Sequence, residues 1–588
     1  MIGEPWRDRP KFMAKPALTP PFTPTVPAML EWMAETYGAD EAQVRDDARL
    51  TFEDLDRRSR EMAIGMLKYG VGKGTRVALL MPNGPQFTVM FMAAARLGAV
   101  VAPLSTLYKA RELAWVLAHG DFHLLLTVDR YLGHDYLGRL EAALPSLGEQ
   151  SAGALRLTDA PYLRGILVWG DCDRPWAASG PEALSIEAAG LAAGHALVAG
   201  IERNIVPADP LCMIFTSGST ADPKCVVHRH GVVLRHSWQK AFGYWPIGDG
   251  DRVIGPRPQF WIAGLAPTLF QSLLAGCCLI EPANLGTAEV LRLLEGEAVT
   301  AACGDGLWLL ALAKDPQMRA AGYKMVQHSL ETALFARLDE QGRATYLNRR
   351  RAAREPAPQE IPRDLLPRSY GMTETLSAHT SLPVGEYLPP DKLGCCGRPM
   401  PGVRLSIVDP QTRRPLGPGE VGEILVGGYS LMEGLYKRER SEVFTEDQMY
   451  ATGDLGSLDE EGFLRFHSRI ADILKVSGAN VSPLEIETRL NLIPEIERCA
   501  VIGLPTTERD VQLVAVVQLR SGQAASEGEI LARLRAELSS YKVPKRVFFF
   551  AADEWPLTGS NKIRKPGLIE PVARRLAAEA GAAPAPPG

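Results

Sequence analysis

The sequence has no run of apolar side chains long enough to cross a membrane, although 46% of its 588 residues are apolar. A membrane-spanning helix needs about 20 consecutive apolar residues. The first segment, MIGEPWRDRPKFMAKPALTPPFTPTVP, carries charges and prolines where a signal peptide needs an apolar stretch. These absences predict a protein of the cytoplasm with no transmembrane segment.

The sequence also has few cysteines and no long run of charges of one sign. The nine cysteines are scattered, and they form no CxxC pair and no spacing that suits zinc or a disulfide framework. The formal net charge of −5 is spread without long runs of one sign, which argues against nucleic acid or an anionic membrane surface as a general partner. We expect reduced thiols and small-molecule partners.

The length predicts at least two domains, because one domain usually holds about 100–200 residues. After a proline-rich arm over residues 1–28, apolar runs such as RVALLMP and LLLTV alternate with helical patterns, as in a parallel or mixed sheet covered by helices. A pattern of short strands separated by turns begins near Pro401, and a compact α+β pattern follows Arg469. We expect an α/β domain over 29–469, a small α+β domain over 470–570 and a low-complexity tail over 571–588.

One segment, FTSGSTADPK from Phe215 to Lys224, has the composition of a phosphate-binding loop. Small residues let backbone N–H groups turn toward an anion, hydroxyls add donors, and the lysine adds charge. A Walker loop closes into a helix at its lysine, whereas Pro223 before Lys224 argues against a helix at that point. Taken alone, the segment fits either a phosphate loop of another kind or a plain turn between two strands.

Four further segments follow in order and separate these alternatives: RSYGMTET (368–375), YATGDLG (450–456), SRIADILKVSGANVSPLEIE (468–487) and PLTGSNKIRK (556–565). Together with the loop they resemble the adenylate-forming (AMP-binding) superfamily, which includes acyl-CoA synthetases, peptide-synthetase adenylation domains and luciferases. The resemblance runs from about Pro27 to Leu568. It implies two α/β sheet subdomains and a small β-rich subdomain, followed by a mobile C-terminal lid domain.

The resemblance also implies a reaction. A carboxylate attacks the α-phosphate of ATP, which gives an acyl adenylate and pyrophosphate, and the acyl group then passes to a thiol. The family pattern implies that Thr373 contacts the α-phosphate, Glu374 ligates Mg²⁺, and Lys562 bridges the carboxylate and the α-phosphate. The residues that it assigns to ATP are Thr216, Ser217, Gly218, Ser219, Thr220 and Lys224 on the phosphates, Tyr370 and Gly371 at the adenine, and Asp454 and Arg469 at the ribose.

For coenzyme A, the resemblance points to the loop that replaces the lysine after the lid rotates, with Ser477, Gly478, Ala479 and Asn480 as candidates. For the acid, it points to an apolar and aromatic pocket made by Trp238, Phe260, Trp261, Gly264 and Leu265. Trp261 stands where peptide-synthetase domains hold an amino group with aspartate. We therefore expect a hydrophobic acid, fatty, alicyclic or aromatic, and free coenzyme A as acceptor.

Three departures from the family pattern stand out. Cys225 replaces the usual glycine after the lysine, and Ala471 replaces a swivel aspartate or lysine. The segment over 327–367 lacks the glycine turn that forms a shelf for adenine, and it is rich in Arg, Ala and Pro with little periodicity. Such a segment arises either by out-of-frame translation between two compensating frameshifts or as a divergent natural loop.

These observations predict an ATP-dependent carboxylic acid–CoA ligase that uses ATP and Mg²⁺ and assembles either as a monomer or as a homodimer. Two alternatives remain open from the sequence. An acyl-AMP ligase would deliver its acyl group to a carrier protein, and a degenerate homologue would bind acyl groups or nucleotides without catalysis. Retention of Lys562, Glu374 and Asp454 argues against the second alternative.

Overall fold

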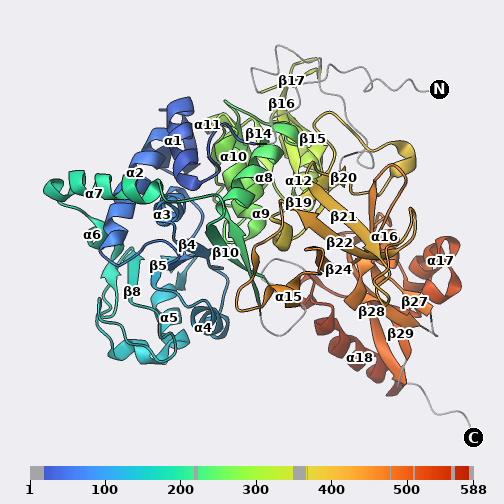
Figure 1. The fold of residues 1–588 in the computed structure, drawn as a ribbon. Coiled ribbons are helices and arrows are strands. Elements are labelled where there is room, and N and C mark those ends of the chain that lie inside the picture. Colours follow the sequence, from blue (N-terminus) through green and yellow to red (C-terminus); the bar gives the residue numbers. More distant parts are fainter. Residues whose placement is uncertain are drawn as a thin grey trace, which may run out of the picture. The chain divides into compact units, whose positions relative to one another are not determined.

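The computed structural model describes residues 19–216, 223–347, 366, 368–476, 479–507, 510–557 and 563–581. The chain divides into two compact units. The first comprises residues 1–404 and 426–450, and the second comprises residues 405–425 and 451–588. The architecture is mixed α/β, as the sequence predicts (Figure 1).

The first unit contains two large sheets, of which one carries the phosphate-loop segment. Its strands β4, β3, β5, β8 and β9 are parallel, and β10 joins β4 in the same sense before the antiparallel neighbours β11 and β23 complete the sheet. In spatial order the strands are β23 (Gly434–Leu435), β11 (Lys224–Arg229), β10 (Pro210–Thr216), β4 (Val100–Pro103), β3 (Arg76–Leu80), β5 (Leu124–Val128), β8 (Gly165–Trp169) and β9 (Ala178–Ser179). The apolar runs of the sequence are thus the buried central strands, which parallel sheets covered on both faces require.

The second large sheet is also mixed. Its strands follow the order β15 (Tyr323–Ser329), β16 (Thr332–Leu338), β14 (Ala301–Cys303), β12 (Arg252–Ile254), β13 (Cys278–Ile280), β1 (Glu41–Arg45) and β2 (Ala48–Thr51), with β17 (Ala344–Tyr346) beside β16. The first part of the atypical segment over 327–367 forms regular structure, because residues 332–336 are buried in a strand that pairs with β14. Residues 348–365 and 367 lie outside the described residues.

Helices fill the space between the two sheets. Helix α3 (Pro85–Arg96) is buried along almost its whole length, and its core cluster contains side chains from strands of both sheets, such as Leu79 and Leu279. A helix with apolar residues on all sides is stable only inside a core. Its neighbours in that cluster include α1 (Val26–Tyr37), α2 (Phe52–Leu67), α8 (His230–Gly243) and α10 (Gln271–Leu274). Helix α1 begins inside the segment predicted as an arm over 1–28.

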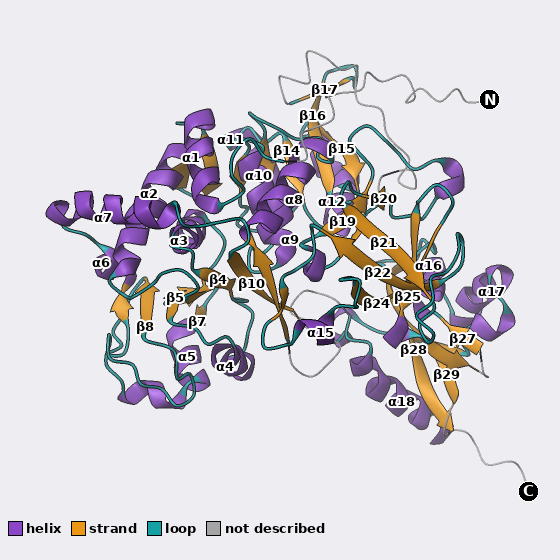
Figure 2. Cartoon of the chain, viewed as in Figure 1, coloured by secondary structure: helices purple, strands orange, loops and turns teal. Residues whose placement is uncertain are grey.

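The other elements of the first unit are short or lie at its periphery (Figure 2). They are helices α4 (Ala110–His119), α5 (Tyr136–Ala143), α6 (Gly180–Leu184), α7 (Ala188–Glu202), α9 (Ile262–Gly264), α11 (Thr287–Gly296), α12 (Gly306–Lys314), α13 (Pro316–Ala320) and α15 (Arg440–Val443), the hairpin β6 (Arg130–Tyr131) and β7 (His134–Asp135), and the small sheet β18 (Tyr370–Gly371), β19 (Ala378–Ser381) and β20 (Arg398–Pro399).

The second unit contains most of a four-stranded sheet and a small α+β fold. The sheet follows the order β21 (Val403–Val408), β22 (Gly422–Gly428), β24 (Tyr450–Leu458) and β25 (Leu464–Arg469). After the hairpin β26 (Leu474–Val476) and β27 (Ala479–Val481), strands β28 (Ile496–Thr507), β29 (Asp510–Leu519) and β30 (Arg546–Phe549) form a three-stranded sheet. The pattern of short strands predicted after Pro401 and the compact pattern after Arg469 are these two parts.

Helices cover both faces of the three-stranded sheet. Helices α16 (Pro483–Leu490) and α17 (Glu527–Glu537) pack on one face, and α18 (Pro566–Gly581) packs on the other. The low-complexity tail predicted over 571–588 is therefore helical as far as Gly581, because Val572 is fully buried against the sheet and alanine favours a helix. The boundary predicted between domains at 469 and 470 stays a prediction.

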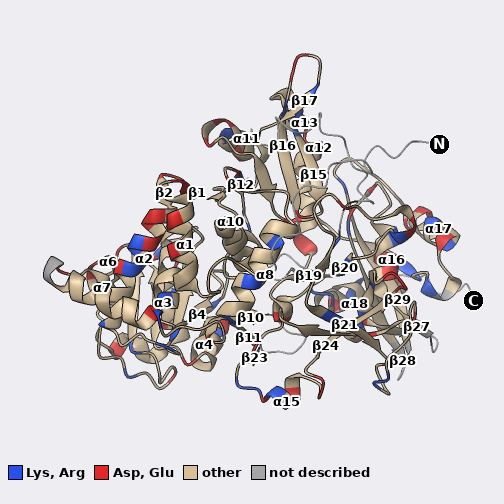
Figure 3. Ribbon diagram, turned by 45° about the horizontal axis from the view of Figure 1, so that its top comes forward, with Lys and Arg blue, Asp and Glu red and all other residues tan. Residues whose placement is uncertain are grey.

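Charges of both signs are interspersed over the surface, as on α2, where Arg57 pairs with Asp54 and Glu61 (Figure 3). None of the helices in the described part of the chain combines the length and the apolar character that crossing a bilayer demands.

Candidate active site

The segment predicted to bind phosphate connects two antiparallel strands of the first unit. Strand β10 ends at Thr216 and β11 begins at Lys224, and these two residues pair opposite each other. Lys224 therefore begins a strand and not a helix, which confirms the prediction from Pro223. Ser217, Gly218, Ser219 and Thr220 lie outside the described residues.

Cys225 follows Lys224, and its side chain is buried in a core cluster with Phe215. Burial raises the pKa of the Cys225 thiol. The thiol is therefore protonated and serves as a small apolar side chain in the core.

The YGMTET segment makes a tight turn in the same unit. Strand β18 leads into a 3₁₀ helix over Thr373–Thr375. A Cβ atom on Gly371 would lie 2.1 Å from the carbonyl oxygen of Ser377, so only glycine fits there. Leu376 ends the helix in the left-handed region with φ of 68°. Such a conformation is costly for a side chain of this size and is typical of a functional turn. The ring of Tyr370 is buried with an edge-on contact to His379, at 5.2 Å between centroids.

His228 joins the YGMTET turn to the strand that follows the phosphate loop. Its Nε2 lies 2.8 Å from the backbone carbonyl oxygen of Thr373. Burial lowers the pKa of His228 to about 4, so the ring is neutral near pH 7 and Nε2–H is the donor. The other nitrogen, Nδ1, is buried with no hydrogen-bond partner. Sequence reasoning missed this residue, although a histidine in the apolar strand directly after the loop is a signal for it.

Glu374 has a geometry that suits a magnesium ligand. The hydroxyl of Tyr450 donates a hydrogen bond of 3.2 Å to its Oε1 atom. The side chain is half-buried, so one edge of the carboxylate remains accessible. Mg²⁺ prefers one or two carboxylates together with water and phosphate oxygens, and a single oriented carboxylate beside a phosphate loop fits that preference.

In the second unit, the two residues predicted at the ribose face each other. Asp454 on β24 and Arg469 on β25 are directly opposite in register, and Arg469 Nε lies 3.6 Å from Asp454 Oδ1. Asp454 is only 5% exposed, and it follows Gly453, whose φ of 73° suits glycine. The pairing of the two strands thus places an acceptor-only carboxylate beside a guanidinium.

The remaining lid residues are only partly described. Ala479 and Asn480 lie in β27, which pairs with β26. Ser477, Gly478 and Lys562 lie outside the described residues.

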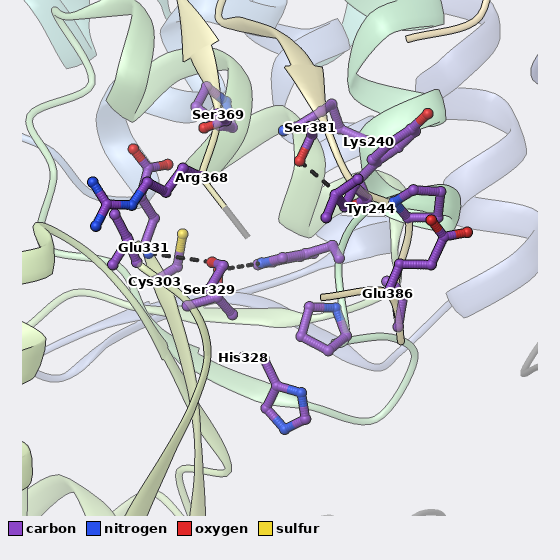
Figure 4. A pocket seen from close by; sticks show the side chains of 18 of the residues that line it. Lys240, Tyr244, Cys303, His328, Ser329, Glu331, Arg368, Ser369, Ser381 and Glu386 are labelled. Atoms are coloured by element: carbon purple, nitrogen blue, oxygen red, sulfur yellow. Dashed lines mark hydrogen bonds between the residues drawn. The ribbon is translucent and has the colours of Figure 1, made fainter. Parts of the chain in front are cut away.

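A pocket of about 290 Å³ opens in the first unit beside the YGMTET segment (Figure 4). Ser369 and Arg368, which directly precede Tyr370, belong to its wall. Aromatic and aliphatic side chains make up much of the remaining lining, namely Tyr244, Trp245, Pro246, Pro267, Leu330, Leu382, Pro383 and Val384. Charged side chains also contribute, namely Lys240, Arg257, Glu331, Arg368 and Glu386.

The residues predicted to line an acyl pocket do not line this cavity, and their role in an acyl pocket stays a prediction. Trp238 packs in an aromatic cluster with Trp32 and Phe242, and Leu265 is fully buried in the core between the sheets. The rings of Phe260 and Trp261 contact each other at 5.1 Å between centroids. A Cβ atom on Gly264 would lie 1.9 Å from the carbonyl oxygen of Pro258, so this glycine serves close backbone packing. None of these five residues is among those that line the pocket.

The period of the α-helix explains why Lys240 lines the pocket and Trp238 does not. Residues three or four apart share one face of a helix, so Lys240 of α8 and Tyr244, which directly follows α8, face the pocket while Trp238 turns into the core. From 265 to 270 the chain forms a π-helical turn that includes Pro267, which lines the pocket. In the sequence, the spacing of Lys240 and Tyr244 indicated that these two side chains lie on the same side.

Comparisons with known proteins agree with this geometry. The family model described as AMP-binding enzyme matches residues 30–436, and the model of the AMP-binding enzyme C-terminal domain matches residues 485–562. A feruloyl-CoA synthase of an Amycolatopsis species is 30% identical over 520 residues, which cover 88% of this chain and 92% of the relative. The mitochondrial medium-chain acyl-CoA ligase of Homo sapiens is 25% identical over 572 residues, with 94% and 88% covered. The structure of ATP-bound MatB from Rhodopseudomonas palustris superposes with a TM-score of 0.70 at 22% identity and covers 93% of this chain and 99% of its own.

Proposed function

This chain belongs to the AMP-binding enzyme family and is an AMP-forming acid–CoA ligase, and from that premise we propose that it joins a carboxylic acid with a hydrophobic body to coenzyme A through an acyl adenylate. Ligases of this family use ATP, Mg²⁺ and coenzyme A. The nature of the acid and the roles of individual residues are our proposal.

The hydrogen bond from His228 to the Thr373 carbonyl carries the proposal. His228 lies on the strand that begins at Lys224, and Thr373 begins the turn that holds Glu374. The bond therefore keeps the end of the phosphate loop and the YGMTET turn in a fixed relation. Fixed donors and charges around a reacting phosphate stabilise the charge that develops there at no cost of reorganisation.

Each residue then has a defined task. Lys224 and Thr216 hold the β- and γ-phosphates and stabilise the leaving pyrophosphate, and the Thr373 hydroxyl donates to the α-phosphate. Glu374 holds Mg²⁺, which neutralises phosphate charge when bound. Tyr450 orients the Glu374 carboxylate through its hydroxyl.

In the second unit, Asp454 accepts hydrogen bonds from the ribose hydroxyls, since a carboxylate is purely an acceptor. Arg469, opposite Asp454, contributes a positive charge near the ribose and phosphate. Lys562 bridges the acid carboxylate and the α-phosphate during adenylation, and the hairpin of β26 and β27 contacts coenzyme A in the thioester step.

The pocket beside Ser369 supports an acid with a hydrophobic body of modest size. Its volume of about 290 Å³ lies at the lower end of the range for small-molecule pockets. The aromatic and aliphatic walls fit a short aliphatic chain or a single ring. Relatives named for feruloyl and for medium-chain acyl groups also act on acids with apolar bodies. A location in the cytoplasm and a homodimer remain predictions.

Pyrophosphate release tests the proposal. The purified protein is supplied with ATP, Mg²⁺ and a panel of short aliphatic, alicyclic and aromatic acids, with and without coenzyme A, beside a Lys562→Ala variant. We expect release that requires an acid, increases with coenzyme A and collapses in the variant. Equal release without any acid, or thioester formation only on a carrier protein, would refute it.

A further inference from the structure

The side chain of Lys240 faces the pocket and forms an ion pair with no carboxylate of the described residues. Lys240 lies on α8 and lines the cavity. Its Nζ atom lies 5.9 Å from the centroid of the Tyr244 ring, and it makes no hydrogen bond or ion pair with any residue that the structure describes. A buried ammonium is costly unless an anion pairs with it. Burial accordingly lowers the pKa of Lys240.

Glu331 lies near enough to favour the charged form of Lys240, but it forms no ion pair with Lys240 among the described residues. Glu331 pairs with Arg257 at 3.5 Å, and its side chain is 54% exposed. Arg257 also donates a hydrogen bond of 2.7 Å to the Gly304 carbonyl, so it is already held in place. Glu386 lies close enough to Tyr244 to raise the pKa of its phenol, and it makes no ion pair with Lys240 among the described residues.

A third cation lines the same cavity. The Nε atom of Arg368 is buried and has no hydrogen-bond partner among the residues that the structure describes. The pocket thus carries three cationic side chains, Lys240, Arg257 and Arg368, against two carboxylates, Glu331 and Glu386. One of these carboxylates is already engaged with Arg257, so an anionic group on a ligand would find Lys240 available.

We propose that the acid substrate carries a second carboxylate, and that Lys240, flanked by Arg257, binds it. This inference rests on the proposed function and specifies its substrate class as dicarboxylic acids with a short hydrophobic body. The apolar walls contact the body, one carboxylate reaches the α-phosphate near Thr373, and the other pairs with Lys240. An ammonium suits this task as a point charge that tolerates several carboxylate orientations.

Matched acids test the inference. Hexanoate, adipate and monomethyl adipate share one chain length but differ in the charge at the far end, and the same three forms are compared up to the ten-carbon acids. Thioester formation gives kcat/KM, and calorimetry gives binding of each acid to the protein. We expect the diacid to be preferred by at least about tenfold over both neutral forms at the favoured length, since a buried charged pair contributes at least about that factor.

The variant Lys240→Met keeps the length of the side chain and removes its charge. We expect it to lose the diacid preference at least about tenfold, chiefly through KM. The exposed Lys314→Met variant, on a lysine that does not line the pocket, should keep the preference. Unfolding temperatures of both variants check that the fold is intact.

The outcomes separate the two proposals. Turnover of monoacids equal to or better than diacids would overturn the inference and leave the ligase assignment standing. If no acid were turned over, the proposed function would fail, and calorimetry would then decide the inference. Diacid binding that Lys240→Met abolishes would support it, and absence of such binding would overturn it.

Discussion

The imidazole of His228 donates a hydrogen bond of 2.8 Å to the backbone carbonyl of Thr373, 145 residues farther along the chain. It connects the strand after the phosphate loop to the turn that carries Thr373 and Glu374. We expect His228→Leu to lower kcat/KM for ATP about tenfold or more and to destabilise the fold by about 1–3 kcal/mol, because a buried carbonyl loses its donor. Steady-state kinetics and thermal unfolding measure both effects.

His228→Gln provides the control, since its amide N–H can reach the same carbonyl. We expect this variant to recover most of the activity and to show the same dependence of rate on pH between 6 and 8 as the parent. The His228 pKa of about 4 keeps the ring neutral throughout that range. A kinetic pKa near 6.5 that disappears in His228→Gln would contradict this assignment.

The pair Tyr450 and Glu374 predicts a graded dependence on magnesium. Glu374→Gln removes the charge that binds the cation and should lower kcat/KM by about 100-fold or more. Tyr450→Phe keeps the carboxylate but removes the hydroxyl that orients it, so we expect a rise of about two- to fivefold in the Mg²⁺ concentration for half-maximal rate, the scale of one lost hydrogen bond. Titration of the rate with Mg²⁺ at saturating ATP distinguishes the two variants. An unchanged titration in Tyr450→Phe would show that the hydroxyl does not orient the ligand.

Asp454 and Arg469 predict discrimination at the ribose. A site that hydrogen-bonds a hydroxyl rejects the analogue that lacks it, because the polar group of the site is then left unpaired. We expect the parent enzyme to prefer ATP over 2′-deoxy-ATP and 3′-deoxy-ATP by about tenfold or more, and Asp454→Asn to reduce both preferences. The two ratios of kcat/KM are the measurement. Undiminished preferences in Asp454→Asn would place the ribose elsewhere.

The sequence allowed predictions about features that depend on residues close together in the chain. The proline before Lys224 argued against the helix that a Walker loop has there, and a strand begins at Lys224. A turn at TGDLG was the alternative to a ribose role for Asp454, and the structure places Asp454 inside strand β24. The sequence did not show which side chains are buried by contacts between distant parts of the chain. Trp238 and Lys240 are two residues apart, and only the arrangement of α8 between two sheets decides that the first faces the core and the second the pocket.

Prediction from the sequence was limited in the same way for the segment over 327–367. The segment showed little periodicity, yet residues 332–338 form a strand that pairs with β14 from an earlier part of the chain and with β15, its hairpin partner. This pairing favours a natural sequence over 327–347, and sequencing the gene across codons 327 to 367 tests the frameshift hypothesis. Two compensating shifts found there would assign a different sequence to that edge of the sheet.

Glu281 predicts a pH dependence of stability. The carboxyl is buried, and the side-chain amides of Gln43 and Gln259 donate to it at 2.9 and 2.6 Å. Burial raises its pKa from 4.5 to about 8. The unfolded chain therefore loses this proton near pH 4.5 while the folded chain keeps it to about pH 8, so the contribution of Glu281 to stability falls as the pH rises between these values.

Glu281→Gln removes this ionisation and keeps the shape. We expect the variant to match the parent in stability at about pH 4 and to exceed it at pH 8 by on the order of 4 kcal/mol, at about 1.4 kcal/mol per pKa unit. Urea unfolding at several pH values gives the difference in free energy of unfolding between the two proteins. The contributions of all other titrating groups cancel in that difference. Parallel stability profiles for the two proteins would mean that Glu281 titrates normally in the fold.

Lys562 separates the two half-reactions. In the proposed cycle this lysine acts only while the acid is adenylated, and the hairpin near Asn480 contacts coenzyme A in the thioester step. We expect Lys562→Ala to reduce adenylate formation by about 100-fold or more, because a charge that neutralises two oxyanions is lost. The same variant should convert a synthetic acyl adenylate and coenzyme A to thioester at close to the parent rate. Both rates are measured in single-turnover experiments. Equal losses in the two half-reactions would indicate that Lys562 acts on the lid as a whole, and unimpaired adenylation would remove it from the catalytic set.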